Sequence, residues 1–176
     1  MLDLGIRYCL IVEDDAFPVI NLPSQVAAFG LPSDFDLCFV NERMEHRSAP
    51  ALTEPNLAAF KIHRPIEVVR SWPKDFRAPG ADGYLLSENG ARKLLEFVDR
   101  DGFGGAVDWS LLGYSIRSEE HSLLLPGSVA AHIIPNVFRR SPGRLAAYSL
   151  FPCLIRTWGP SVRAPEDAAT TRIDGP

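Results

Sequence analysis

Three consecutive carboxylates, Glu13, Asp14 and Asp15, follow the apolar run at residues 8–12. Like charges at the end of a buried strand oppose one another's ionisation. A hard divalent cation such as Mg²⁺ or Mn²⁺ removes this conflict by binding the carboxylate oxygens. In an open α/β sheet, the carboxyl ends of strands are also where ligands bind. The cluster therefore indicates either a metal and phosphate site or a solvated turn after a strand.

Side chains alternate in direction along an extended chain, so two of these three carboxylates can address one ion directly. We expect Asp15 and Glu13 to be metal ligands, and Asp14 to face a sugar or ribose hydroxyl as part of the nucleotide-binding surface. His132 lies in an apolar run near the end of the domain and could complete the metal shell. A core histidine with a satisfied hydrogen bond is the competing interpretation of His132.

Two further segments place polar residues beside glycines or an aromatic ring. Gly83 and Tyr84 follow a glycine-rich turn at 79–82, where the backbone can approach a ligand closely and the tyrosine can stack or donate a hydrogen bond. A plain turn before a strand is the alternative. Asp108 precedes Trp109, and such a pair can hold a sugar, because the acid accepts hydroxyl hydrogen bonds while the ring covers an apolar sugar face. Asp108 could equally cap a helix.

The elements that must position these residues alternate between strand-like and helix-like patterns, which predicts an α/β domain with a mixed sheet. The first strand is expected to be buried on both faces. The acidic pair at 34–36 fits a structural or capping role better than a metal role. Strand patterns occur at 6–12, 36–40 and 65–72, in the short run before Ser87, and as a pair within 122–134. Helix patterns occur at 22–30, at 88–99 with Ser87 as the cap and Leu94, Leu95 and Val98 as the buried face, and at 109–116.

Composition narrows the class of protein. The 176 residues suit one domain, predicted at 1–159, with a disordered tail at 160–176. The net charge of -4 and the absence of a dense Lys/Arg run argue against a nucleic-acid partner. No run approaches the roughly 20 apolar residues of a membrane span. The three cysteines have no zinc spacing and fit a reducing compartment, so we expect a cytoplasmic protein, with the inner face of the membrane reached through a partner.

The order of these motifs resembles glycosyltransferase family 25, the lipooligosaccharide galactosyltransferase type that also includes collagen galactosyltransferase domains. An apolar strand ending in Glu-Asp-Asp comes first, and an Asp-x-Asp pair precedes the next strand. The longest match runs from Gly80 to Leu95 and reads Gly-x-Asp-Gly-Tyr-Leu-Leu-Ser-x-x-Gly-Ala-x-Lys-Leu-Leu. A Val-Asp pair ending at Asp108 closes the series. The resemblance covers roughly residues 6 to 115.

The resemblance implies a GT-A-like (Rossmann-like) fold, a nucleotide-sugar donor such as UDP-galactose, and Mn²⁺ or Mg²⁺ as a cofactor. The acidic motif of the family matches residues 13–15, and its turn before the helix matches Gly83 and Tyr84. Its late aspartate matches Asp108, which could orient the acceptor hydroxyl or accept its proton as the catalytic residue. In the family a segment of several dozen residues precedes the acidic strand. The expectation is therefore an N-terminally shortened domain, whose missing part could come from a partner chain or a homo-oligomer.

The function predicted from the sequence is transfer of a sugar, with galactose expected, from a UDP-sugar to a saccharide acceptor in LPS or other cell-surface glycan biosynthesis. An inactive remnant, or a glycan-binding module on the same scaffold, is the alternative that the short N-terminus favours. A metal-dependent phosphoryl-transfer enzyme is the third hypothesis, which lacks a recognisable nucleophile motif or phosphate loop in the sequence.

Overall fold

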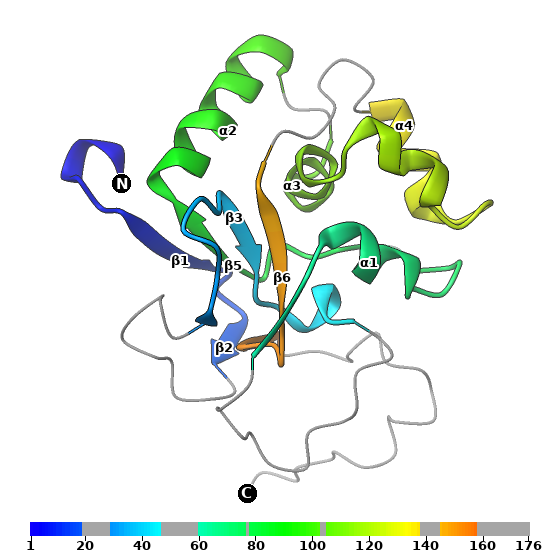
Figure 1. Cartoon of the computed structure of the whole chain (residues 1–176), viewed down its shortest axis with the longest axis horizontal. Helices are drawn as coiled ribbons and strands as arrows, with labels where there is room; N and C mark the ends of the chain where they lie inside the picture. The colour runs from blue at the N-terminus through cyan, green and yellow to red at the C-terminus, as the bar shows by residue number, and fades with distance from the viewer. Residues whose placement is uncertain (19–28, 47–59, 77, 103–104, 138–144, 158–176) are drawn as a thin grey trace, which may run out of the picture.

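The computed structural model describes residues 1–18, 29–46, 60–76, 78–102, 105–137 and 145–157. These residues form an α/β fold around a mixed five-stranded sheet with the strand order β1-β5-β3-β6-β4 (Figure 1). The strands are β1 Tyr8–Val12, β3 Leu37–Phe39, β4 Lys61–His63, β5 Gly83–Ser87 and β6 Ala147–Phe151. Only β3 and β6 run parallel in this sheet, and its other neighbours are antiparallel. A second, two-stranded sheet pairs β2 Ala16–Pro18 with β7 Ile155–Thr157.

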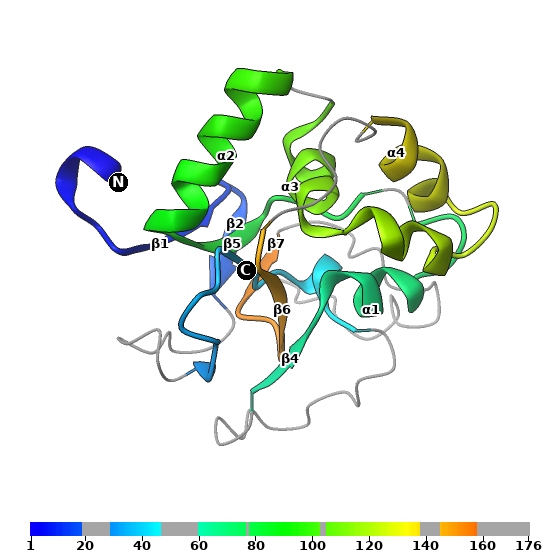
Figure 2. The same ribbon diagram turned by 45° about the horizontal axis from the view of Figure 1, so that its top comes forward.

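Helices cover one face of the five-stranded sheet, as Figures 1 and 2 show from two directions. The α-helices are α1 Pro65–Arg70, α2 Glu88–Asp101, α3 Val107–Ser115 and α4 Val129–Val137, and 3-10 turns occur at Leu2–Leu4 (η1), Glu42–Met44 (η3) and Ser118–Leu123 (η4). In the described part of the chain, no helix has the length and apolar character needed to cross a membrane.

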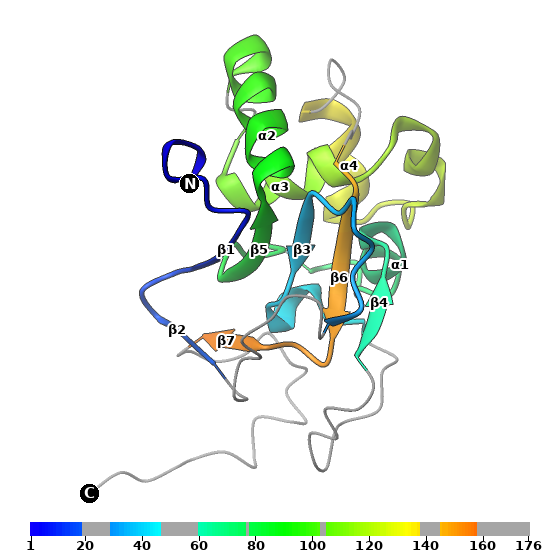
Figure 3. The ribbon, with the colours of Figure 1, turned by 60° about the vertical axis from the view of Figure 1, so that its left-hand side comes forward.

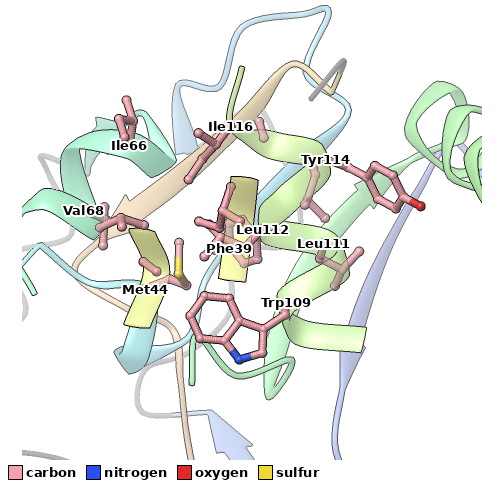
Figure 4. Close-up of a cluster of buried hydrophobic side chains, with 14 of the residues drawn as sticks. Phe39, Met44, Ile66, Val68, Trp109, Leu111, Leu112, Tyr114 and Ile116 are labelled. Atoms are coloured by element: carbon pink, nitrogen blue, oxygen red, sulfur yellow. The ribbon is translucent and has the colours of Figure 1, made fainter. Parts of the chain in front are cut away.

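Strand alternation divides the core between the two faces of the sheet. Leu37 and Phe39 of β3 point to the helical face and join a large buried cluster. Cys38, between them, joins a smaller cluster on the other face with Leu150 and Ile155. Figure 4 shows the centre of the larger cluster, where Leu112 of α3 packs toward Phe39. Because β3 is fully buried on both faces, it is the centre of the domain.

The carboxylate of Asp36, which is fully buried, joins four elements at the start of β3. Its Oδ2 accepts hydrogen bonds from Lys93 Nζ at 2.6 Å and from the backbone N–H of Ala146 at 2.7 Å. Its Oδ1 accepts from Asn89 Nδ2 at 2.6 Å, and its backbone oxygen accepts from Ser87 N at 3.0 Å. Asp36 therefore fixes α2, β5 and the approach to β6 against β3, and the structural role favoured from the sequence is confirmed.

Several sequence predictions are confirmed with small shifts of boundary. The strand expected at 36–40 is β3, and the strand before Ser87 is β5. The helix expected at 88–99 is α2, and Ser87 caps it by accepting a hydrogen bond from Gly90 N at 3.0 Å. The helix expected at 109–116 is α3, although its N-cap residue is Ala106 and Asp108 lies in its first turn.

Other predictions are wrong, for identifiable reasons. The first strand is not buried on both faces, because Tyr8 and Val12 are exposed, and among the described strands β1 is the terminal one and pairs antiparallel with β5. Residues 65–72 contain helix α1, since Pro65 starts a helix well and Glu67 caps it through the Arg64 backbone N–H. Residues 122–134 form the end of η4 and most of α4 instead of two strands, and Ser128 accepts a hydrogen bond from Ala131 N at the start of α4.

On α2, Leu95 is 54% exposed and does not belong to the buried face, which is centred on Phe97. The helix expected at 22–30 falls mostly on residues outside the described ranges, and so does the tail expected at 160–176.

Replacing Asp36 with Asn should destabilise the fold by about 3 kcal/mol, because Lys93 and Ala146 N–H lose a charged acceptor that water cannot replace. Chemical denaturation measures this change. Glu88→Gln is the matched control, since it breaks the more exposed pair between Arg92 and Glu88 (2.7 Å) and should cost less than about 1 kcal/mol. Equal losses in the two variants would contradict the central role of Asp36.

Gly90→Ala should destabilise the protein by about 1–3 kcal/mol, whereas the same change in an open helix usually stabilises it. A Cβ at this position would lie 2.2 Å from the backbone oxygen of Asp36 and would push α2 away from β3. Gly105→Ala is the control, because its Cβ would have no neighbour within 4 Å. Thermal unfolding of both variants tests this, and an unchanged or higher melting temperature for Gly90→Ala would contradict the close contact.

Candidate functional site

The strand directions bring three distant parts of the chain to one edge of the sheet. Because β1, β3 and β6 run in the same direction, their carboxyl ends share this edge, where β5 begins. Glu13 therefore follows β1 beside Asp82, which precedes β5, and Asn41 follows β3 nearby. Figure 3 shows η3 and the small β2–β7 sheet at the same end of the molecule. We call this the carboxyl edge, defined by Glu13, Asn41, Arg43 and Asp82.

Glu13 and Asp82 form a cross-strand pair of carboxyl groups. The backbone N–H of Glu13 donates to the oxygen of Asp82 at 3.2 Å, and the two side chains share a hydrogen bond in which Glu13 is the donor. Desolvation raises the pKa of Glu13, and the charge of Asp82, the shared hydrogen bond and the charge of Asp15 raise it further. Burial also raises the pKa of Asp82, although Arg43 and the bond from Glu13 oppose the shift. The pair thus holds a proton more tightly than ordinary carboxylates do.

Arg43 is the cation of the carboxyl edge. Its Nε lies 3.2 Å from Oδ2 of Asp82, and the side chain of Asp82 is 3% exposed. Gly80 makes this approach sterically feasible: its φ is +69°, and a Cβ there would lie 2.7 Å from Oδ2 of Asp82 and 2.8 Å from Cδ of Arg43. The turn is thus built around the ion pair, and any side chain at position 80 would displace it.

The fully buried Asn41 holds the turn in place. Its Nδ2 donates to the backbone oxygens of Gly80 at 3.1 Å and Gly83 at 3.3 Å, and its Oδ1 accepts from Met44 N at 2.9 Å. Sequence reasoning assigned no role to Asn41 or to Arg43. The available signal was a polar run, residues 41–43, directly after a buried strand.

Several of the residues predicted as site residues gather at this edge. Asp15 lies near enough to raise the pKa of both Glu13 and Asp82, while Asp14 is exposed in the same turn. Tyr84 is half-buried, and its pKa is raised by burial and then by the charges of Cys9 and Glu13. Gly83 packs inward instead of facing solvent, because a Cβ there would lie 2.8 Å from the side chain of Ile155.

Asp108 and His132 lie on helices. Oδ1 of Asp108 accepts a hydrogen bond from the backbone N–H of Trp109 at 2.8 Å. Trp109 is buried in the larger core cluster, and Figure 4 shows its ring directed toward Met44 of η3. His132 is exposed on α4, not in a strand, and Figures 1 and 2 place α4 on the far side of α3 from β1. The structure does not bring His132 to the acidic turn.

The carboxyl edge holds two adjacent carboxyl groups, Glu13 and Asp82, whose oxygens are the atoms that could bind a divalent cation. Within the ranges that the structure describes, no three His, Cys, Asp or Glu side chains converge as a closed metal site requires. Buried Oδ2 of Asp82 forms an ion pair with Arg43 at 3.2 Å but makes no hydrogen bond in those ranges, and the adjacent Glu13 carries further oxygen atoms that could bind a metal. Mg²⁺ commonly takes one or two protein carboxylates and completes its shell with water and substrate phosphates.

The opposite edge of the sheet carries a separate pocket of about 410 Å³. Arg7, Tyr8 and Phe35 contribute to its wall with the first turns of α2, and the rings of Tyr8 and Phe35 stack 5.5 Å apart. None of the residues predicted as site residues lines this pocket. The carboxyl edge, where these residues gather, is therefore the candidate functional site.

Comparison of the chain with protein-family models, with curated proteins and with solved structures found no match.

The raised pKa values at the carboxyl edge predict a pH dependence of stability. The folded state binds protons at Glu13 and Asp82 more tightly than the unfolded chain, so stability falls as the pH rises from the ordinary carboxyl range through the raised pKa. Glu13→Gln removes one of the two groups. The melting temperature of the wild-type protein should therefore fall relative to that of Glu13→Gln between about pH 4 and pH 7.

Asp99→Asn, which removes an exposed carboxylate from α2, is the control for the loss of one carboxylate charge. A melting-temperature difference between the wild type and Glu13→Gln that does not change with pH would show that the folded protein does not raise the pKa of Glu13.

Proposed function

We propose that this chain is a glycosyltransferase domain of GT-A-like architecture, which moves a sugar, with galactose expected, from a UDP-sugar to a saccharide acceptor. One observation carries the proposal. The acidic turn after β1 and the Gly80–Leu95 segment, which are the two strongest parts of the family resemblance, lie side by side because β1 pairs with β5 over its whole length. Glu13 and Asp82 meet across that pairing although they lie 69 positions apart in the sequence.

The charges at the carboxyl edge suit a diphosphate that is bound with a cation. Glu13 and Asp82 would hold Mn²⁺ or Mg²⁺, and such an ion would supply positive charge to stabilise the leaving nucleotide. Arg43 adds a guanidinium that can donate hydrogen bonds to a phosphate oxygen. Asp14, which is exposed in the same turn, is in a position to accept a hydrogen bond from a ribose or sugar hydroxyl.

Asp108 is the proposed catalytic residue. Its carboxylate is held in the first turn of α3 by the backbone N–H of Trp109, which fixes the direction of the acid. An acid held in this way can orient an acceptor hydroxyl and take its proton as the new glycosidic bond forms. Trp109 itself is 8% exposed, so its ring is committed to the core and does not offer a free face to a sugar.

A glycan-binding module, or an inactive relative on the same scaffold, is the second candidate. The specific observation that favours it is the ion pair between Arg43 and Asp82, which partly neutralises the buried carboxylate before any metal binds. A protein of this kind would bind saccharides and would not bind UDP in a metal-dependent manner.

Calorimetric titration with UDP, with and without Mn²⁺, tests the proposal. We expect binding that requires Mn²⁺, and we expect Asp82→Asn to weaken it by more than about tenfold, because one of the two ligand carboxylates is lost. Asp34→Asn is the matched control, since this exposed carboxylate lies at the opposite edge of the sheet and should leave UDP binding unchanged.

Product analysis then separates the reactions. Release of UDP from UDP-galactose in the presence of an acceptor is the expected result, and Asp108→Asn should abolish it without loss of UDP binding. Release of phosphate from a simple phosphoester would instead indicate the phosphoryl-transfer hypothesis. Absence of UDP binding both with and without Mn²⁺ would overturn the proposed function.

A further inference from the structure

The outer edge of β1 is open in the part of the chain that the structure describes. β1 is the terminal strand of the five-stranded sheet, and Figure 3 shows it beside β5 with no strand on its other side. An exposed edge strand presents a row of unpaired N–H and C=O groups, to which another strand can add.

Three residues of β1 direct their backbone groups to this open edge. Glu88 N donates to Arg7 O at 2.8 Å and Glu13 N donates to Asp82 O at 3.2 Å, so the hydrogen-bonded pairs with β5 fall on odd-numbered residues. In an antiparallel ladder, the alternate residues point their N–H and C=O groups away from the partner strand. Tyr8, Leu10 and Val12 therefore offer N–H and C=O groups at regular spacing along the open edge.

The side chains of the same residues are unusually apolar for an exposed edge. Tyr8 is 42% and Val12 is 47% exposed, and they share one face of β1 with Leu10, which packs partly against the smaller core cluster. Sheet edges that must stay unpaired usually carry lysines, prolines or bulges, and residues 8–12 contain none of these. The edge is thus built to accept a strand.

We infer that β1 pairs antiparallel with β1 of a second copy of this chain, which joins two five-stranded sheets into one across a two-fold axis at Leu10. This register uses every outward-facing backbone group on the strand. It places Tyr8 opposite Val12 of the second copy, an aromatic and a β-branched side chain, which is a favourable cross-strand pair. Tyr8 of each copy would thereby cover Val12 of the other copy.

Charge complementarity selects a second copy as the occupant. In the same register, Arg7 lies opposite Glu13 of the second copy, and the pair occurs twice because of the two-fold symmetry. Both residues are exposed in the single chain. A parallel arrangement in register would place like charges together and would lose both ion pairs. The strand is therefore complementary to itself only in the antiparallel direction.

The pairing also adds a residue to the carboxyl edge. Arg7 of the second copy lies beside Glu13, on the side opposite Asp82, so each copy supplies a guanidinium to the acidic pair of the other. Dimerisation would therefore add positive charge to the candidate site. Its tests measure molecular mass and cross-linking, which do not depend on nucleotide or sugar binding.

Cysteine cross-linking tests the register directly. In a background with Cys9→Ser, Leu10→Cys places two cysteines on the two-fold axis, with Cα atoms about 5.5 Å apart, which is within disulfide range. Val12→Cys is the control, because its two copies would lie about 13 Å apart along the strands. The remaining cysteines, Cys38 and Cys153, are buried. We expect a disulfide-linked dimer from Leu10→Cys and none from Val12→Cys under mild oxidation.

Analytical ultracentrifugation with charge-reversed variants provides the second test. We expect the wild-type chain to dimerise and Arg7→Glu to weaken the dimer by about tenfold, since it replaces two attractive pairs with two repulsive ones. The double variant Arg7→Glu/Glu13→Arg restores the pairs and should recover the wild-type dimer, while circular dichroism confirms that each variant is folded. A wild-type monomer at its highest soluble concentration, or equal cross-linking at positions 10 and 12, would overturn the inference.

Discussion

The fold depends on one buried carboxylate at the start of β3. Asp36 binds Lys93 and Asn89 of α2 through its side chain, and it binds the chain entering β6 through Ala146. A buried charge is costly unless it is fully paired, so these contacts favour the observed arrangement of the elements. The contact with Gly90 tightens the constraint, because α2 crosses the backbone of Asp36 too closely for any side chain. Since α2 follows β5 directly, fixing α2 also fixes β5 between β1 and β3.

The candidate site is a consequence of that arrangement. With β5 held between β1 and β3, the turn before β5 lies next to the acidic turn after β1, and Asp82 meets Glu13. The same order of strands leaves β1 at the outside of the sheet, where one side of its backbone has no strand neighbour among the described residues and where Tyr8 and Val12 stay partly exposed. The strand order therefore explains both the close approach of the two carboxyl groups and the unpaired outer side of β1. Arg43 compensates part of the negative charge within the chain, and a bound cation or a second copy would compensate more of it.

Local signals predicted the parts of the fold that depend on local chemistry. The apolar run of β3, the Ser87 cap of α2 and the acidic turn at 13–15 could all be recognised from neighbouring residues. The errors arose where tertiary contacts decide the outcome. Strand β6 is an interior strand, yet its short sequence at 147–151, Ala-Tyr-Ser-Leu-Phe, has no clear strand pattern, and distant partners, Asp36, β3 and β4, fix its place. The apolar run of β1 appeared doubly buried because hydrophobicity alone does not reveal which strands lie at an edge. In the site, Arg43 and Asn41 were missed because their partners, Asp82 and Gly80, lie about forty residues away.

Anomalous diffraction at the manganese absorption edge, from crystals grown with UDP and Mn²⁺, tests the central claim most directly, because it locates the cation without reference to activity. If two distant motifs form one ion site, a single anomalous peak will lie between the carboxylates of Glu13 and Asp82, in contact with the diphosphate. A peak elsewhere on the molecule, or a carboxyl edge that holds no manganese while UDP is bound, would contradict the account.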